Sequence, residues 1–270
     1  MTMPVAADKD DITSIVISGA SSGLGAALAL ELAGPGVRLG LLGRNQQRLD
    51  AVVADCEKRG AICHPGCFDI TDRAALAHYC AGFHHDGPVD ILISNAGILA
   101  GRDQTDTIES GEIANRVIST NLTAAIDIVN LCLPPMRARG RGKIVMISSL
   151  AAFSPLADAP AYSAAKAGLV AYGLALRQAL SRDGIDVIVS CPGYVATPMA
   201  DIHIGARPLQ ITAQAAAKRV IAAMRDNSPL SGFPFTLYWS ARLSQVLPEW
   251  VRRITTKGLR FHVGTPHDKT

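Results

Sequence analysis

The chain has 270 residues, of which 49% are hydrophobic and 18% charged, and its formal net charge is +3. These values predict a globular protein with a large core, and they argue against a disordered chain and against nucleic acid as the main partner. The first residues lack the long apolar segment of a signal peptide, and no segment is expected to reach the length of a membrane-spanning helix. The six cysteines include no C-x-x-C pair, which favours free thiols in a reducing, cytoplasmic compartment, and we expect no metal site.

Short apolar runs rich in valine and isoleucine alternate with longer stretches of helical periodicity. The runs predict strands at residues 14–18, 37–42, 61–64, 89–94, 143–148 and 185–190, with a weaker strand at 233–238. The intervening stretches predict helices near residues 23–33, 46–59, 72–82, 109–137, 160–182 and 212–226, with Asn45 and Thr71 as N-caps of the second and third.

Runs that are apolar on both faces indicate strands covered on both sides. We therefore expect an α/β fold: a Rossmann-like, doubly wound sheet of about seven parallel strands flanked by helices on both faces. A single domain over residues 12–240 accounts for this pattern. Ligands of such sheets bind at the carboxyl ends of the strands, so the residues that follow each apolar run are the candidates for the site.

The first predicted strand runs into Gly19-Ala20-Ser21-Ser22-Gly23-Leu24-Gly25, which fits two kinds of site. It matches the G-x-S-x-G nucleophile elbow of serine hydrolases, and it also fits a glycine turn that binds phosphate at a helix N-terminus. A hydrolase elbow needs a second oxyanion donor from a loop after an earlier strand, and too few residues precede Ser21 for such a strand. We therefore expect Ser21 to bind a ligand rather than to attack one.

Tyr162 and Lys166 lie four residues apart in a predicted helix, and so on one face of it. A neighbouring ammonium favours the ionised form of a phenol, whose pKa is otherwise near ~10. The same pattern occurs on ordinary amphipathic helices, so it needs other motifs beside it. Ser163-Ala-Ala-Lys166 matches the S-x-x-K string of penicillin-binding enzymes, but the companion motifs S-D-N and K-T-G are absent from the sequence.

In combination, these motifs resemble those of the short-chain dehydrogenase/reductase family in its compact single-domain form. The matching features are Gly19-x-x-x-Gly23-x-Gly25, Asn95-Ala96-Gly97, Asn121, Ser148-Ser149, Tyr162-x-x-x-Lys166 and Pro192-Gly193 with Thr197, in this order and at strand ends. The resemblance covers about residues 12–200. It implies an oxidoreductase that interconverts a carbonyl and a secondary alcohol by hydride transfer with a nicotinamide cofactor.

The resemblance also implies roles for individual residues. Tyr162 would be the general acid–base and Ser149 would hold the substrate oxygen, while Lys166 would lower the pKa of Tyr162 and bind the nicotinamide ribose. Asn121 would support a water relay to the lysine, or satisfy backbone groups at a helix kink. Cofactor contacts are implied for Gly19, Ser21, Ser22, Gly23, Leu24, Gly25, Asp69, Ile70, Asn95, Ala96, Gly97, Tyr162, Lys166, Pro192, Gly193, Val195 and Thr197.

The end of the second predicted strand bears on the choice of cofactor. Enzymes that use NAD usually have an acidic residue there to bind the ribose hydroxyls, and this chain has Gly43 followed by Arg44. A guanidinium suits a 2′-phosphate by charge and by geometry, so we expect NADP(H) to be preferred over NAD(H).

The last part of the chain should bear on the substrate. Residues 198–211 are similar to the family's substrate lid, and residues 241–270 form a basic, aromatic extension with six Lys/Arg against two acidic residues. Either the extension packs on the core or at a subunit contact, or it touches a membrane or an apolar, lipid- or glycan-linked substrate. We expect a small-molecule carbonyl or alcohol as substrate and a homodimer or homotetramer. A non-catalytic NADP-binding sensor of the same fold is the alternative.

Overall fold

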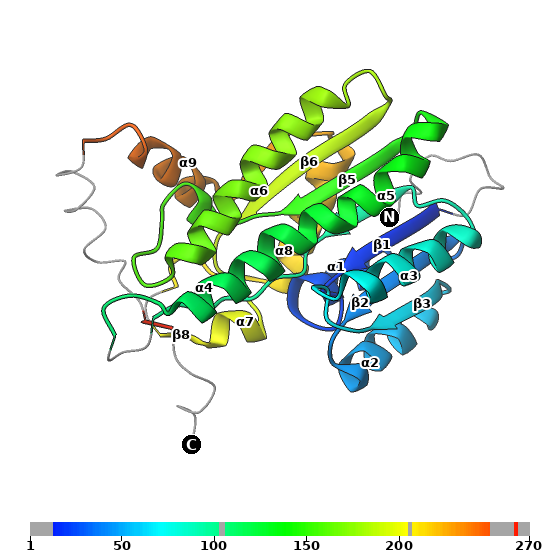
Figure 1. The fold of residues 1–270 in the computed structure, drawn as a ribbon, viewed down its shortest axis with the longest axis horizontal. Coiled ribbons are helices and arrows are strands. Elements are labelled where there is room, and N and C mark those ends of the chain that lie inside the picture. The colour runs from blue at the N-terminus through cyan, green and yellow to red at the C-terminus, as the bar shows by residue number, and fades with distance from the viewer. Residues whose placement is uncertain (1–12, 103–105, 205–206, 249–261, 264–270) are drawn as a thin grey trace.

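The computed structural model describes residues 13–102, 106–204, 207–248 and 262–263, and these contain a seven-stranded parallel sheet (Figure 1). The strand order is β10-β6-β5-β4-β1-β2-β3, and neighbouring strands pair in parallel throughout. The strands are β1 (Thr13–Ser18), β2 (Val37–Gly43), β3 (Ile62–Cys67), β4 (Ile91–Ser94), β5 (Gly142–Ile147), β6 (Ile185–Pro192) and β10 (Leu230–Phe233). This order confirms the predicted Rossmann-like, doubly wound fold.

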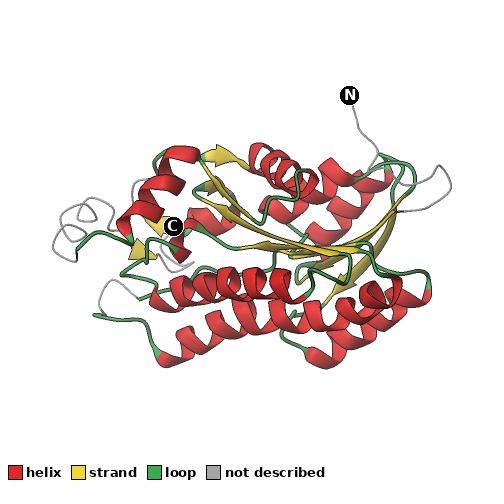
Figure 2. Ribbon diagram, turned by 90° about the horizontal axis from the view of Figure 1, so that it is seen from above, coloured by secondary structure: helices red, strands yellow, loops and turns green. Residues whose placement is uncertain are grey.

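Helices cover both faces of the sheet (Figure 2). One face carries α1 (Gly23–Leu32), α2 (Gln46–Glu57) and α8 (Ala213–Arg225), and the other carries α3 (Arg73–His85), α5 (Ala124–Arg139) and α6 (Pro160–Ala179). The central strand shows why its sequence is a continuous apolar run. Ile15 and Ile17 are buried under the first layer of helices, and Val16 is buried under the second.

The predicted helix at 109–137 is one long rod with a local change of winding. It consists of α4 (Gly111–Ile118), a π-helical turn at Ser119–Thr123, and α5, which ends at Arg139. By length and composition this rod could cross a membrane, so the expectation that no segment reaches that length is wrong. Its buried side chains, among them Ile128, Val129 and Met136, pack in the core beside the sheet.

The prediction for residues 233–238 is also wrong, because the strand β10 ends at Phe233 and a helix, α9 (Phe235–Ser244), follows it. The alternation of Phe233, Phe235 and Leu237 suggested a strand. Leu237 and Ala241, however, are four residues apart and pack together on the core through one face of the helix. Pro234 precedes the first turn of α9, where the missing N–H costs no hydrogen bond.

The N-cap of α3 differs from the prediction by one residue. The side chain of Asp72, not that of Thr71, accepts hydrogen bonds from the N–H groups of Ala74 and Ala75. The hydroxyl of Thr71 instead donates a hydrogen bond to the carboxylate of Asp69. Asn45 caps α2 as predicted, with its side-chain oxygen accepting from the N–H of Arg48.

Candidate active site

A cavity of about 750 Å³ lies at the carboxyl ends of the strands. Its walls come from the turn after β1, the ends of β2, β4, β5 and β6, the first turns of α6, the segment 192–208 and α9. The motifs predicted from the sequence therefore meet in one place. Gly25, Asp69 and Asn121 do not border the cavity, and the other predicted site residues do.

The glycine turn after β1 has the geometry of an anion-binding turn. Gly19 and Gly23 have positive φ angles of 69° and 57°, a region that glycine adopts without strain. A side chain on Gly25 would meet the carbonyl oxygen of Gly19 at 2.1 Å, so α1 can start this close to the turn only with glycine there. The first turn of α1 holds no acidic residue, and its N-cap, Ser22, makes no side-chain capping bond. The N–H groups and the helix dipole therefore remain available to a pyrophosphate.

The glycine turn is tied to the end of β4 by two polar side chains. The Ser18 hydroxyl accepts hydrogen bonds from the N–H groups of Asn95 and Ala96, each at 3.0 Å. The Asn95 amide donates to the carbonyl oxygens of Ser18 and Gly19 at 3.0 and 3.1 Å. Asn95 thus acts as a brace between two strand ends, and Ser18, which the sequence analysis did not single out, is its partner.

Ser149, Tyr162 and Lys166 form a cluster at the cavity wall. Hydrogen bonding with Ser149 acts to lower the pKa of Tyr162, and the Lys166 Nζ lies over the tyrosine ring, 5.7 Å from its centroid. Lys166 is only 4% exposed, and its Nζ donates a hydrogen bond to the carbonyl oxygen of Ile147 at 2.9 Å. The structure therefore brings Ser149, at the end of β5, to the same cavity as Tyr162 and Lys166 of α6.

Burial dominates the protonation of this cluster. Burial raises the pKa of Tyr162, and hydrogen bonding with Ser149 partly offsets this rise. Burial also lowers the pKa of Lys166 to about 8. The expected effect of Lys166 on the pKa of Tyr162 stays a prediction: its Nζ lies over the tyrosine ring, 5.7 Å from the centroid, and burial disfavours its own charge.

Asn121 lies in the π-helical turn and is fully buried. Its side-chain oxygen accepts from the N–H of Ile98 at 2.7 Å, and its amide donates to the carbonyl oxygen of the same residue at 2.8 Å. The side chain thus satisfies backbone groups beside the helix irregularity, which was one of the two expected roles. Asn121 also holds the segment after Gly97 close to Lys166. The backbone there is so near that a Cβ added to Gly97 would lie within 3.5 Å of both the Asn121 side chain and the Lys166 Nζ.

Ser148 makes a structural contact that the sequence analysis did not describe. Its buried hydroxyl donates a hydrogen bond to the carbonyl oxygen of Lys166 at 2.7 Å. This contact joins the end of β5 to the helix that carries Tyr162 and Lys166. The two neighbouring serines therefore have different roles: Ser148 contacts the backbone of α6, and Ser149 faces Tyr162.

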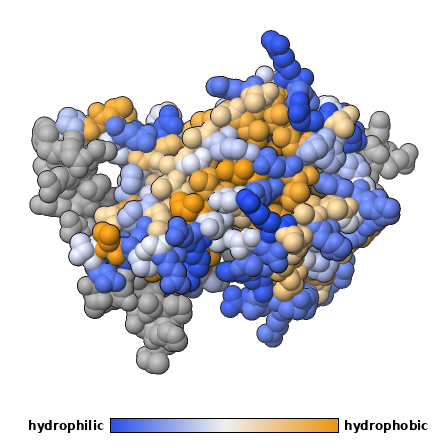
Figure 3. Space-filling view, viewed as in Figure 1, coloured by the Kyte–Doolittle hydropathy of each residue, from blue (hydrophilic) through white to orange (hydrophobic). Residues whose placement is uncertain are grey.

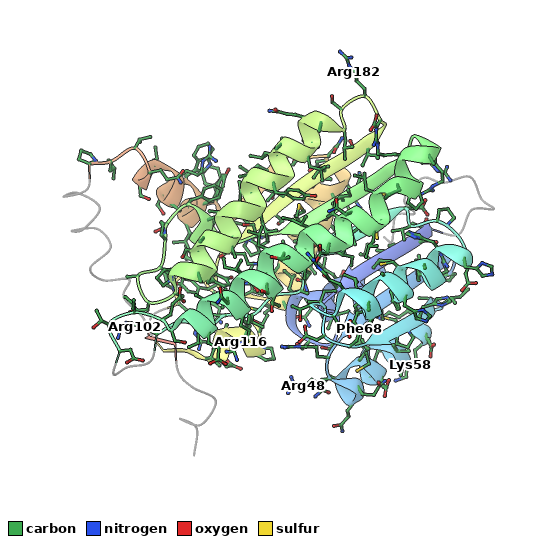
Figure 4. The ribbon with its side chains drawn as sticks, viewed as in Figure 1. Arg48, Lys58, Phe68, Arg102, Arg116 and Arg182 are labelled. Atoms are coloured by element: carbon green, nitrogen blue, oxygen red, sulfur yellow. The ribbon has the colours of Figure 1, made fainter. Side chains whose placement is uncertain are left out.

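The far end of the cavity is basic. Arg44 and Arg48 both border it, together with Phe68 and Ile70. Figure 4 shows Arg48 and Phe68 near α2 and β3, on the other side of the molecule from Arg102. Arg44 forms an exposed ion pair with Asp69 at 3.3 Å. Arg48 and Phe68 were missed from the sequence, where nothing in their local pattern marks them as cavity residues.

Thr197 connects the predicted lid to the glycine turn. Its hydroxyl accepts from the N–H of Ala200 and caps the short helix α7 (Pro198–Asp201). Its methyl group packs so close to the glycine turn that a Cβ added to Gly23 would lie 3.0 Å from it. The lid continues through β8 (His203–Ile204) to β9 (Ile211–Thr212), which pairs with β7 (Val195–Ala196), and residues 205–206 lie outside the described part.

The described residues of the extension stand next to this lid. Leu237, Ser240, Ala241 and Ser244 of α9 border the cavity. The strand β11 (His262–Val263) pairs antiparallel with β8. The other residues from 249 onward lie outside the described part of the chain. Within the described ranges, no group of three or more His, Cys, Asp or Glu side chains could hold a metal ion.

Known proteins share this fold and these motifs. The family model for short chain dehydrogenases matches residues 13–204. The ketoacyl reductase HetN from Nostoc sp. is 34% identical over 224 residues, which cover 80% of this chain and 76% of the relative. The crystal structure of an actinorhodin polyketide ketoreductase with NADPH matches with 26% identity and a TM-score of 0.74 over 86% of this chain and 99% of that one. L-Sorbose reductase from Gluconobacter frateurii, solved with NADPH and L-sorbose, is similar in fold, with 23% identity and a TM-score of 0.74 over 86% of this chain and 97% of that one. The chain therefore belongs to the short-chain dehydrogenase/reductase family and is an oxidoreductase of carbonyl and CH–OH groups.

Proposed function

We propose that this enzyme is an NADPH-dependent reductase that converts a carbonyl into a secondary alcohol with Tyr162 as the proton donor. The observation that carries the proposal is that Ser149, Tyr162 and Lys166 line one cavity, with the Lys166 Nζ over the tyrosine ring. Similarity to ketoacyl reductases supports reduction as the direction of the reaction.

The residues that would hold the cofactor fit its parts. The glycine turn offers N–H groups and a helix N-terminus to the pyrophosphate, and a side chain at Gly25 would abolish that arrangement. Lys166 would bind the nicotinamide ribose, and the segment from Pro192 to Thr197 would border the nicotinamide. When bound, the nicotinamide supplies a hydride to the carbonyl carbon.

The protein groups supply the proton and its control. Because burial raises the pKa of Tyr162, its phenol keeps its proton at neutral pH, as a donor must. The Ser149 hydroxyl would donate a hydrogen bond to the carbonyl oxygen and stabilise the negative charge that develops there. The Tyr162 Oη would then transfer its proton to that oxygen. The Ser148 contact with the Lys166 carbonyl holds the helix in the register that this transfer needs.

NADPH is favoured over NADH by charge. Arg44 and Arg48 border the end of the cavity where the adenosine ribose would lie, and β2 ends in Gly43 without an acidic residue. Two guanidinium groups suit a 2′-phosphate, and an acidic residue at this point would repel it. NADPH in the matching ketoreductase structure supports the same choice.

Tyr162→Phe tests the mechanism. The variant removes one oxygen, so we expect NADPH binding within about twofold of the parent and a loss of turnover of at least about a hundredfold on a panel of carbonyls. NADPH fluorescence measures the binding, and NADPH absorbance measures the turnover. Turnover equal to that of the parent would contradict the role of Tyr162. A parent protein that binds NADPH but reduces no carbonyl would support the alternative, a non-catalytic NADP-binding sensor.

A further inference from the structure

The exposed large hydrophobic side chains of this protein gather at one place. Nine such side chains are exposed among the described residues, and seven of them lie in the lid and in residues 235–247. The seven are Met199, Leu209, Phe235, Trp239, Leu243, Val246 and Leu247. Both segments border the cavity. The distribution therefore marks the mouth of the active site, not the surface in general.

The helix α9 has two different faces. Its inner face borders the cavity with Leu237, Ser240, Ala241 and Ser244. On the outer face, Phe235, Trp239 and Leu243 follow one another at intervals of four residues, with exposed fractions of 72%, 47% and 60%, which puts them on one stripe of the helix. Val246, just after the end of α9, is 81% exposed. Figure 3 shows hydrophobic side chains at the upper left of the molecule, where Figure 1 places α9.

The outer stripe carries no charge. The one charged side chain between residues 235 and 248 is Arg242, whose guanidinium lies over the ring of Phe153, 5.1 Å from its centroid, on the inner side. A phenylalanine and a tryptophan with aliphatic neighbours are typical of a helix that lies in the interfacial region of a bilayer. Phe235 and Trp239 already contact each other edge to face at 6.1 Å, so the stripe is preformed.

The charge of the same region selects the type of surface. Residues 241–270 hold six Lys/Arg against two acidic residues, while the rest of the chain holds 20 against 21. Of the described parts of this segment, the last turn of α9 borders the cavity with Ala241 and Ser244, and β11 pairs with β8. A cationic segment attached beside an apolar stripe is attracted to anionic lipid headgroups.

We propose that the outer stripe of α9, formed by Phe235, Trp239 and Leu243, together with Val246 just after the helix, docks the enzyme on anionic membranes, and that the substrate is an apolar carbonyl compound dissolved in the bilayer. The second part rests on the proposed reductase function. The substrate would enter between the lid and α9, where Leu99, Leu156, Met199 and Leu237 give the cavity an apolar wall.

Docking is tested with vesicles and the full chain. The parent should sediment with phosphatidylcholine vesicles that contain phosphatidylserine, and less with phosphatidylcholine alone. Trp239→Glu/Leu243→Glu should lower the partition into the anionic vesicles at least about tenfold, because two apolar side chains that the bilayer would bury are replaced by charged ones. Ile62→Glu is the matched control, since Ile62 is 53% exposed in β3, outside the lid and α9, and should partition like the parent. Circular dichroism and thermal melts check that all variants fold.

Two results would overturn the docking proposal. The first is equal partition of the parent and the Trp239→Glu/Leu243→Glu variant, or no partition of the parent into either vesicle. The second is a parent that binds no vesicle but forms a dimer by light scattering which the same two substitutions dissociate, since the stripe would then bind a second copy of the chain.

Activity separates docking from the reductase function. With a water-soluble ketone, the Trp239→Glu/Leu243→Glu variant should keep the turnover of the parent, because the stripe does not border the cavity. With a long-chain ketone in anionic vesicles, its turnover should fall at least about tenfold, in step with the loss of partition. Equal turnover of parent and variant on the vesicle substrate would contradict delivery from the membrane. If no ketone is reduced by either protein while the parent binds vesicles, the reductase function fails and docking stands.

Discussion

Glu109 caps the helix that carries Tyr162: its Oε1 accepts a hydrogen bond of 2.5 Å from the N–H of Ala161. The two residues are 52 positions apart in the chain. The helix α6 has no cap of its own, because Ala159 stands at the N-cap position and the first turn has no acidic residue. A carboxylate from another loop therefore satisfies the helix N-terminus and its dipole one residue before the proton donor.

Removal of this cap should affect both stability and turnover. Glu109→Ala is expected to lower the free energy of unfolding by about 1 kcal/mol, as for the loss of an N-cap, and to lower kcat more than it changes the KM for NADPH. Glu109→Gln keeps an acceptor oxygen and should recover most of both. Glu112→Ala, an exposed acidic residue in the first turn of α4, is the control and should leave kcat unchanged. Urea denaturation and steady-state kinetics measure the outcome, and a Gln variant as impaired as the Ala variant would contradict the capping role.

Two glycines should respond in opposite directions to alanine. A side chain on Gly25 would meet the Gly19 carbonyl oxygen at 2.1 Å and the Asn95 amide at 2.6 Å, so Gly25→Ala should destabilise the protein by about 1–3 kcal/mol and weaken NADPH binding. Nothing lies within 4 Å of a side chain on Gly82, which is exposed in α3, so Gly82→Ala should stabilise by about 0.5–1 kcal/mol. Urea denaturation measures both. A neutral Gly25→Ala would show that the turn can relax.

Arg44 and Arg48 should carry the preference for NADPH. Arg44→Asp is expected to lower kcat/KM with NADPH at least about tenfold, since a charge-assisted hydrogen bond contributes roughly 1.5–3 kcal/mol, and to change kcat/KM with NADH little. Arg48→Ala should have a smaller effect in the same direction. Lys58→Asp is the control, because Lys58 stands at the other end of α2 and pairs with Asp55. An unchanged ratio of NADPH to NADH efficiency in Arg44→Asp would refute the assignment.

Lys166 should make cofactor binding depend on pH. Burial lowers its pKa to about 8, so the ammonium loses its proton as the pH rises through that value. A cation at this position would favour binding below pH ~8, and the Kd of NADPH is expected to increase above it. Fluorescence titrations from neutral to alkaline pH measure the Kd. Lys166→Met should bind more weakly at neutral pH and show a flat profile. If the Met variant keeps the pH dependence of the parent, another group is responsible.

The sequence predicted the sheet well for a physical reason. Strands of a parallel sheet are buried on both faces, and their continuous apolar runs stand out between amphipathic helices. The prediction failed at residues 233–238, where a short strand passes directly into α9 and the apolar spacing fits both structures. The N-cap at Asp72 was missed by one residue because Thr71 and Asp72 are both common capping residues.

The site shows the same division. Gly25 and the pair Tyr162–Lys166 follow local rules of spacing, and the sequence assigned them to a turn and to one helix face. The contact of Glu109 with Ala161 has no sequence signal, because it joins a loop to the first turn of a helix that is distant in the chain. Arg48 lies in the first turn of α2 and Arg44 just before its N-cap, and their place at the cavity depends on how α2 docks.

By itself, the sequence determined the fold class, the order of the motifs and the chemistry that they can carry, because periodicity, glycine turns and side-chain type are local properties. The tertiary structure decided the protonation of the cluster, since burial of Tyr162 and Lys166 arises from elements far apart in the chain. It also decided that residues 235–244 form a helix that borders the cavity and exposes an apolar stripe, because the direction of each side chain follows from packing against the rest of the molecule.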